Sequence, residues 1–322
     1  PLALHGVVVK KDGTVIELNI GEDDSDPIVG ISDLLVHLSA DQMSKKASNV
    51  IEGEDLNVTI GSMPLDGEEK DAVKANILKL LKEKYDFEED DFVSAEIEVV
   101  PAGKARDYGL DRSMVAGYGH DDRICAYTSM MAQLETESVK RTAVTLLVDK
   151  EEVGSIGATG QHSRFFENTV AEVMDRLGEY SELNVRRALK NSKMLSSDVS
   201  AAFDPNYAAV NEEKNSAFMG HGLVFNKYTG SRGKGGCNDA NAEFLQKIRT
   251  IFNEAGVCWQ IGELGKVDQG GGGTIAFMMA DWGAEVVDCG TAMLSMHAPY
   301  DLLSKADAYE TYLAYKAFFE SK

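Results

Sequence analysis

The chain has 322 residues, of which 43% are hydrophobic and 26% charged, and its formal net charge is -21. This length exceeds what one hydrophobic core usually supports, so we expect two globular domains. No apolar run approaches the roughly 20 residues that a membrane-spanning helix needs. The negative charge would repel a phosphate backbone, and no basic stripe is present, so we predict neither a membrane nor a nucleic-acid partner.

The cysteines and the first residue indicate the setting of the protein. Four widely spaced cysteines without a CxxC pair are too few for a disulfide framework, which favours a reducing, cytoplasmic location. The chain begins at Pro1, with neither an initiator Met nor a signal segment. We therefore expect a further segment upstream of Pro1 in the native protein.

Residues 1–95 are predicted to form a smaller, β-rich domain. A hairpin is expected around Asp12-Gly13, and an acidic loop covers 21–27. Helix and strand periodicities then alternate. The predicted elements are strands at 5–9 and 14–20, a helix at 32–46 capped by Ser32, a strand at 56–60, a helix at 68–85 and a strand at 92–100. A Gly-rich break over 101–111 places the domain boundary around 93–105.

Residues 96–322 are predicted to form a second domain in which strands alternate with longer helices, an α/β pattern. The predicted strands lie at 142–149, near Leu195, near Val224, at 258–261 and at 285–289. The predicted helices lie at 163–181, 239–255, 274–279 and 302–319.

Candidate catalytic side chains are sought where strands end, because α/β sheets bind ligands at the carboxyl ends of their strands. Glu151 and Glu152 follow the apolar run 144–148 and precede Gly154. One carboxylate of such a pair can bind a metal while its neighbour accepts a proton from water. An isolated pair of this kind is more commonly a solvated acidic turn.

Three further positions carry ligand-type side chains. Asp198 follows the short run 195–197, although a lone Asp there is more often a cap. His297 suits a ligand, and equally a buried histidine of the core. Of Asp121 and Asp122, treated as part of an extended segment, at most one is expected to reach a shared site. Together these residues form a nitrogen and oxygen donor set that suits zinc, or alternatively cobalt or manganese.

Two Gly-rich loops are also candidates for binding. The loop at 228–236 lacks the spacing of a phosphate-binding loop, so nucleotide binding is not predicted. The loop at 268–274 includes Gly272 and Thr274 and runs toward a predicted helix. Its backbone N–H groups could hold a carboxylate or a developing oxyanion, and a flexible turn explains it as well.

The motifs Asp-Asp-Arg at 121–123, Glu-Glu-Val-Gly-Ser at 151–155 and Leu-Ser-Met-His at 294–297 resemble the aspartyl aminopeptidase family. These are di-zinc aminopeptidases, including vacuolar aminopeptidase-like members. The resemblance spans nearly the whole chain, including a run at 33–38. It implies a mixed-sheet α/β catalytic domain interrupted by a β-rich assembly domain, here residues 1–95.

The resemblance also implies roles for individual residues. Glu151 matches the catalytic base and Asp121 the carboxylate that bridges two zinc ions. Glu152 and His297 match ligands of one zinc, and Asp198 matches a ligand of the other. The implied protein is a homo-oligomer, typically a dodecamer, in which a histidine reaches a neighbouring active site. The histidine that best matches this role is His37.

One motif of the family, His-x-Asp-Ser-Pro, is absent from the sequence. It supplies a further zinc ligand, so this chain would offer only Asp121 and Asp198 to the second zinc and bind it weakly. The implied reaction removes an N-terminal residue from a peptide. The residue removed is expected to be Asp or Glu, and Lys227 or Arg232 could pair with its side chain. The alternatives are a di-metal exopeptidase of different specificity and a non-catalytic shell or scaffold protein.

Overall fold

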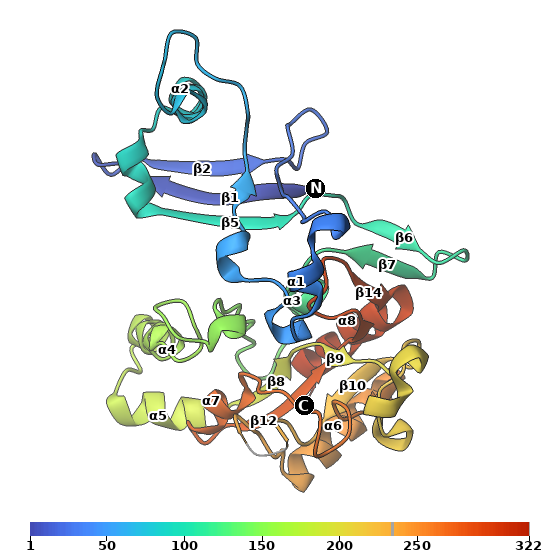
Figure 1. The fold of residues 1–322 in the computed structure, drawn as a ribbon. Helices are drawn as coiled ribbons and strands as arrows, with labels where there is room; N and C mark the ends of the chain where they lie inside the picture. Colours follow the sequence, from blue (N-terminus) through green and yellow to red (C-terminus); the bar gives the residue numbers. More distant parts are fainter. Residues whose placement is uncertain (233–234, 322) are drawn as a thin grey trace. The chain divides into compact units, whose positions relative to one another are not determined.

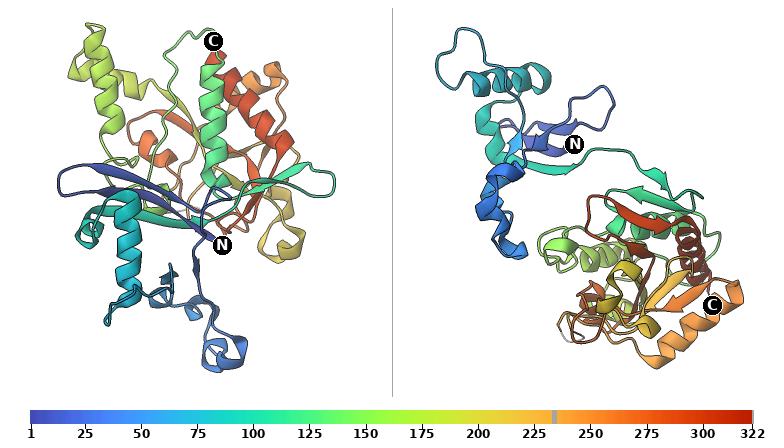
Figure 2. Two further views of the ribbon diagram at one scale, coloured as in Figure 1. Left: turned by 90° about the horizontal axis from the view of Figure 1, so that it is seen from above. Right: turned by 45° about the vertical axis from the view of Figure 1, so that its right-hand side comes forward.

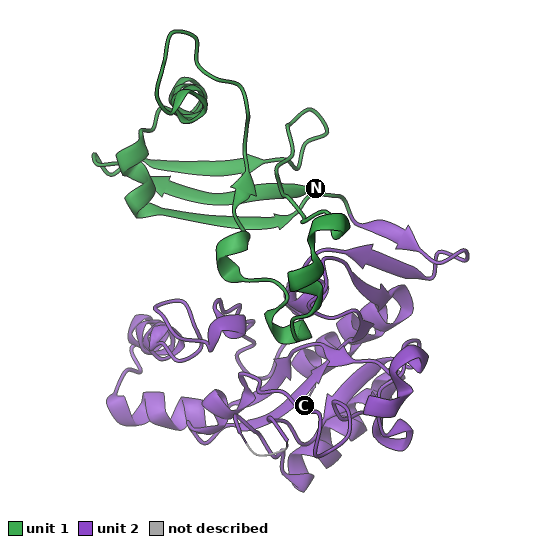
Figure 3. Cartoon of the chain, viewed as in Figure 1, with its two compact units in different colours: residues 1–104 green, residues 105–322 purple. Residues whose placement is uncertain are grey.

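The computed structural model describes residues 1–232 and 235–321. The chain divides into two compact units, an N-terminal unit of residues 1–104 and a C-terminal unit of residues 105–322 (Figure 3). The sequence predicted a smaller domain of residues 1–95 with a boundary around 93–105. In the structure β5 (Ala95–Pro101) pairs along β1 (Leu2–Val9), so the chain leaves the N-terminal unit only after this strand.

The N-terminal unit contains a three-stranded antiparallel sheet in the order β2-β1-β5 (Figure 1). β1 and β2 (Val15–Ile20) form the predicted hairpin, with Val8 opposite Ile16, and this prediction is confirmed. The helix α2 (Ala72–Tyr85) matches the prediction for 68–85 but begins later, and a 3-10 helix, η4 (Glu89–Ser94), precedes β5. The small core of the unit consists of Val8, Leu18 and Phe87.

The predicted helix at 32–46 is wrong. Residues 28–63, which we call the apolar segment, form only short elements. These are β3 (Gly30–Ile31), η1 (Val36–Leu38), α1 (Ala40–Met43), η2 (Ala47–Asn49), η3 (Gly53–Asp55) and β4 (Val58–Thr59). An amphipathic helix is stabilised mainly by packing its apolar face. Here Leu35, Val36 and Leu38 remain exposed, so that stabilisation is missing.

The C-terminal unit is built on two sheets, in the orders β11-β10-β12-β8 and β6-β7-β14-β13-β9. Both contain parallel and antiparallel pairs, which confirms the predicted mixed α/β fold. The strands are β6 (Arg106–Tyr108), β7 (Met114–Gly117), β8 (Lys193–Ser197), β9 (Ser200–Ala201), β10 (Leu223–Asn226), β11 (Trp259–Ile261), β12 (Glu285–Gly290), β13 (Ala292–Leu294) and β14 (Asp301–Ser304).

Six α-helices are described in the C-terminal unit: α3 (His120–Leu134), α4 (Phe165–Arg176), α5 (Glu182–Lys190), α6 (Ala242–Ala255), α7 (Ala276–Ala280) and α8 (Lys305–Glu320). α4, α6, α7 and α8 correspond to predicted helices, whereas α3 and α5 were missed. The prediction for 163–181 ran to the start of α5, where Ser181 accepts a hydrogen bond from the Asn184 N–H and caps the new helix. Three 3-10 helices complete the unit: η5 (Glu151–Val153), η6 (Pro205–Val210) and η7 (Glu213–Asn215).

The predicted strand at 142–149 is also wrong, because these residues pair with no strand of the described chain. Side chains tie the segment to its neighbours instead. The Thr145 hydroxyl donates to the Ser129 carbonyl of α3, and the Gln133 side chain donates to the Ala143 carbonyl. An apolar run has strand propensity, but a strand forms only where a partner edge satisfies its backbone groups.

The main core lies where α6 and α8 cover the sheet that contains β10 and β12. Phe225 of β10 stacks on Phe252 of α6, with ring centroids 5.3 Å apart. α3 and α8 lie side by side (Figure 2). This packing fixes the start of α3 and the ends of β8 and β13, where the candidate site is found. Among the described residues, no helix is both long and apolar enough to span a membrane.

Candidate metal centre

Asp121 and Asp122 lie in the first turn of α3, just after Gly119, whose φ is 66°. Their own backbone angles are not helical. Both side chains come close to Asp198. The expectation that only one of the two would reach a shared site is therefore wrong. It assumed the alternating side chains of a regular strand, whereas these residues form an irregular turn at the start of α3.

Glu151 and Glu152 occupy the short 3-10 helix η5. Left-handed backbone conformations at Lys150 (φ 67°) and Gly154 (φ 94°) bound this turn. The turn directs Glu152 toward Asp121 and His297. Glu151 is half-buried and close enough to Glu152 and Asp121 for their charges to affect its ionisation.

Asp198 directly follows β8, which runs parallel to β12 with Ser197 opposite Cys289. The main chain of Asp198 passes very close to Gly290 at the end of β12. A Cβ atom at Gly290 would lie 1.9 Å from the Asp198 carbonyl oxygen, so only glycine allows this approach. The close approach fixes the backbone position from which the Asp198 side chain extends.

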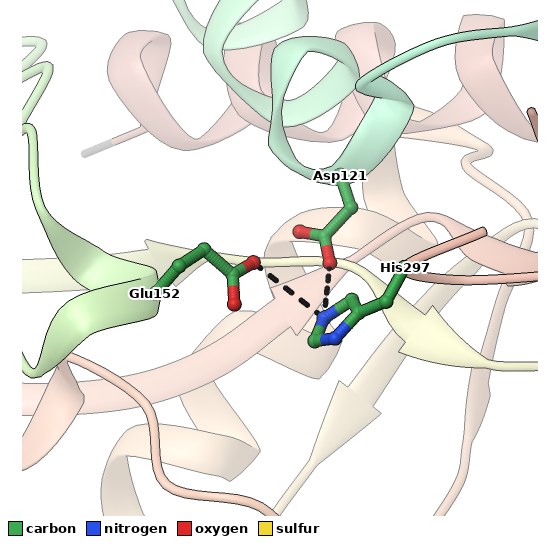
Figure 4. A group of neighbouring side chains, drawn as sticks. All are labelled: Asp121, Glu152 and His297. Carbon is green, nitrogen blue, oxygen red and sulfur yellow. Dashed lines mark ion pairs between the residues drawn. The ribbon is translucent and has the colours of Figure 1, made fainter. Parts of the chain in front are cut away.

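His297 lies in the turn between β13 and β14 and has a φ of 63°. Its Nε2 atom is 2.9 Å from Asp121 Oδ2 and 3.5 Å from Glu152 Oε1 (Figure 4). Its side chain is 61% exposed. The alternative of a buried core histidine is therefore wrong.

The side chains form two neighbouring groups that share Asp121. The first contains Asp121, Glu152 and His297, and the second contains Asp121, Asp122 and Asp198. Within each group the potential ligand atoms lie within 4.8 Å of one another. One carboxylate thus faces both groups, which is the arrangement of a two-metal site with a bridging ligand.

The electrostatics of these groups are unfavourable without a cation. Burial, together with the nearby charges of Asp121 and Glu151, raises the pKa of Asp198 well above its usual value. Burial and the charge of Asp198 do the same to the pKa of Asp122. Burial and Glu152 raise the pKa values of both Asp121 and Glu151. Each carboxylate is therefore harder to ionise than a free one.

Zinc fits this donor set. The groups offer one imidazole and several carboxylates, the ligand types that zinc binds in hydrolases. One Asp122 oxygen is buried and has no hydrogen-bond partner among the described residues. A buried acidic cluster of this kind is destabilising when unpaired, and a divalent cation would offset the repulsion.

The basic residues predicted to bind substrate are placed differently from one another. Lys227 donates to Asp239 at 2.6 Å and lies over the Tyr228 ring, so its charge already has a partner. Arg232 is exposed, and its backbone N–H donates to the Gly270 carbonyl. Gly233 and Lys234 of the same Gly-rich loop lie outside the described residues.

The second Gly-rich loop packs against the first. The Gly230 N–H donates to the Gly272 carbonyl at 2.7 Å, and the Thr274 hydroxyl accepts from the Ala276 N–H at the start of α7. A Cβ atom at Gly271 would lie 2.4 Å from the Gly230 carbonyl oxygen.

In the N-terminal unit, His37 is exposed on η1 within the apolar segment.

Sequence reasoning missed two residues beside the candidate site. From the sequence, at most one of Asp121 and Asp122 was expected to reach the site, and the role was assigned to Asp121. Asp301 was not considered, because only the fold brings it to Asp121. A cavity of about 300 Å³ is lined by Tyr118, Gly119, Asp121, Glu152, His297, Ala298 and Asp301. The cavity places open space directly beside the first group, where a substrate could enter.

A mixed α/β fold with neighbouring carboxylate and histidine groups around a cavity is typical of metal-dependent hydrolases. Comparison with known proteins defines the class further. Residues 1–319 match the family model described as aminopeptidase I zinc metalloprotease (M18). A Clostridium acetobutylicum protein named probable M18 family aminopeptidase 1 is 66% identical over 322 residues, which cover 100% of this chain and 69% of the relative.

Solved structures agree with this match. A Thermotoga maritima M18 aminopeptidase is 46% identical, with a TM-score of 0.96 over 100% of this chain and 71% of that one. Among the relatives found by sequence, a Caenorhabditis elegans protein named aspartyl aminopeptidase is 25% identical over 99% of this chain and 70% of the relative. The S. cerevisiae mApe1 dodecamer shares the fold at 18% identity, with a TM-score of 0.69 over 99% of this chain and 68% of that one.

This chain belongs to the M18 family of zinc aminopeptidases. It is a metallo-aminopeptidase that uses zinc, and the non-catalytic scaffold alternative is set aside. The predicted family resemblance is confirmed.

Proposed function

We propose that the two groups sharing Asp121 form the catalytic centre, with Glu151 as the general base. Asp121, Glu152 and His297 would hold one zinc ion. Asp121 and Asp198 would hold the other. The observation that carries the proposal is the shared position of Asp121 between two ligand groups.

Asp122 adds a third carboxylate to the second group. The sequence offered that group only Asp121 and Asp198. The position of Asp122 beside both residues supports a second cation, because three carboxylates within 4.8 Å repel one another strongly without one.

Zinc held by these residues would supply Lewis-acid polarisation of the scissile carbonyl and activation of an attacking water. Glu151 is suited to accept the proton of that water, because burial and its neighbours raise its pKa above that of a free glutamate. The same carboxyl then protonates the leaving amine. The cavity beside His297 and Tyr118 gives a peptide access to this centre.

For specificity, we propose a preference for N-terminal Asp or Glu. The name of the C. elegans relative supports this preference at 25% identity. Arg232, which is exposed, is the better candidate to pair with an acidic side chain, and the two Gly-rich loops with Gly272 and Thr274 would frame it. The ion pair between Lys227 and Asp239 favours the second candidate, a neutral-residue specificity, because it leaves less free positive charge.

For assembly, we propose a homo-oligomer that is formed through the N-terminal unit, most simply a dodecamer like the S. cerevisiae protein. Residues 28–63 expose many large apolar side chains, a property of surfaces that bind other proteins. His37 lies within this segment, so a second chain would be in contact with it. Cys125, Cys258 and Cys289 are not in disulfides, which supports a cytoplasmic location.

The test is metal content per chain combined with hydrolysis of a panel of peptides that differ only in the N-terminal residue. We expect two zinc ions per chain and fastest turnover for Asp or Glu. Fastest turnover of Leu or Ala peptides by the two-zinc enzyme would instead establish the neutral specificity. A protein that binds zinc at only one group would overturn the two-metal centre.

A further inference from the structure

Asp301 lies beneath the turn that carries Asp121. It is the first residue of β14, which runs antiparallel to β7 with Asp301 opposite Gly117. The chain continues from Gly117 through two residues into α3. The pairing of β14 with β7 therefore fixes Asp301 close to the start of α3, although 180 residues separate it from Asp121.

Asp301 binds the main chain of Asp121 directly. The Asp121 backbone N–H donates to Asp301 Oδ2 at 3.1 Å. N–H groups in the first turn of a helix have no partner within the helix, and a carboxylate is a favourable acceptor there. The backbone of Asp121 is not helical, and this contact ties it to β14 at the point where its side chain leaves the turn.

The hydrogen bond between Asp301 and the Asp121 N–H leaves half of a buried carboxylate without a partner, which is unusual for a purely structural contact. Asp301 is only 2% exposed, and its second oxygen, Oδ1, is buried with no hydrogen-bond partner among the described residues. Asp301 also lines the same cavity as Asp121, Glu152 and His297. A neutral acceptor would hold the same N–H with less repulsion. Positive charge nearby makes a carboxylate at this position more favourable, and a metal ion held by the neighbouring groups would supply such charge.

We propose that Asp301 is a positioning residue for the metal centre. It fixes the main chain of Asp121 so that one carboxylate faces both groups, and it adds negative charge that strengthens cation binding. This inference rests on the proposed function, because it takes Asp121 to be the shared ligand. Groups that orient metal ligands in this way typically contribute about 10- to 100-fold to metal affinity or activity.

The test compares Asp301→Ala and Asp301→Asn with a matched control, Asp307→Ala. Asp307 is equally buried, at 1% exposure, and accepts the backbone N–H of Gly222 at 2.8 Å, but it contacts neither group. We would measure the zinc dissociation constant by competition with a chromophoric chelator, kcat and KM for a peptide, and Tm without metal.

We expect Asp301→Ala to weaken zinc binding about 10- to 100-fold and to lower kcat more than it changes KM. Asp301→Asn keeps an acceptor for the N–H and should recover part of the loss. Asp307→Ala should lower Tm while zinc affinity stays at the wild-type value. If Asp301→Ala does not fold, Asp301→Asn still decides, because the proposal requires weaker zinc binding from the lost charge.

Wild-type zinc affinity in both Asp301 variants would overturn the proposal. An equal loss of zinc affinity in Asp307→Ala would also overturn it, because the loss would then follow the lower Tm. An Asp121→Asn variant separates this failure from failure of the proposed function. If Asp121→Asn weakens zinc binding and the Asp301 variants do not, only the role of Asp301 is wrong. If Asp121→Asn also binds zinc normally, the proposed ligand set is wrong.

Discussion

The two ligand groups and the apolar segment are opposite departures from an ordinary protein surface and core. At the metal centre, Asp122 and Asp198 bury carboxylates that have raised pKa values. In residues 28–63, side chains such as Leu38 and Met43 remain 73% and 70% exposed. Folded chains normally bury apolar groups and solvate charges. Each region is therefore incomplete by itself, the first for a cation and the second for another protein surface.

The difference between the two regions lies in what would complete them. A cation balances charge through a few short bonds, so we expect single substitutions of its ligands to have large effects on zinc binding. A protein surface covers apolar area, so we expect the free energy of association to change in proportion to the apolar area that is lost. The following predictions address first the metal centre, where the largest effect is expected, and then the apolar segment.

Glu151→Gln should have the largest effect on activity. It removes the proton acceptor but keeps the size of the side chain, so we expect kcat to fall at least about 10²- to 10⁴-fold while zinc content is unchanged. Steady-state kinetics with metal analysis checks this, and Glu213→Gln on η7 serves as a control with normal activity. Retained turnover would remove Glu151 from the mechanism.

Asp198→Asn should reduce zinc from two ions per chain to one. It should also raise the Tm of the metal-free protein at pH 8, because it removes a buried charge whose pKa is raised in the folded state. The opposite effects on zinc binding and on metal-free stability distinguish a ligand from a structural acid. A variant with two zinc ions would exclude Asp198 as a ligand.

Leu38→Glu combined with Met43→Glu should break the proposed oligomer without changing the fold of the N-terminal unit. Both side chains are already exposed, so charge there is tolerated in a single chain but not in an apolar contact. Light scattering after size-exclusion chromatography measures the mass. Leu110→Glu is the control, because Leu110 is even more exposed and lies outside the segment. An unchanged mass of the double variant would place the contact elsewhere.

Asp288→Asn should have the smallest effect, and one that depends on pH. Burial raises the pKa of Asp288 to about 6, so in the folded state it holds its proton more tightly than in the unfolded state. Its contribution to stability is present below pH 4 and is lost as the pH rises to about 6. The asparagine variant should lack this loss, which is about 2–3 kcal/mol. Urea unfolding of metal-free protein at pH 4 and pH 7 checks this, and equal slopes with pH would contradict it.

Local sequence signals determined several elements of the fold and the candidate residues. The turn at Asp12-Gly13 specified the first hairpin, and the apolar periodicity of 239–255 specified α6, because turn chemistry and one buried face act over short distances. Glu151, Glu152 and His297 were found because each lies in a short motif, and Asp198 because it follows the short run 195–197. Their spacing along the chain said nothing of how close they would be.

Tertiary structure decided what depended on partners. The apolar runs at 32–46 and 142–149 had the periodicity of a helix and a strand, but they lack the packing face and the paired edge that would stabilise these states. Asp122 reaches the centre because it lies in the turn at the start of α3, and Asp301 because β14 pairs with β7. Sequence periodicity records the preferences of one segment, whereas the energies that place these residues come from segments that are far apart in the chain.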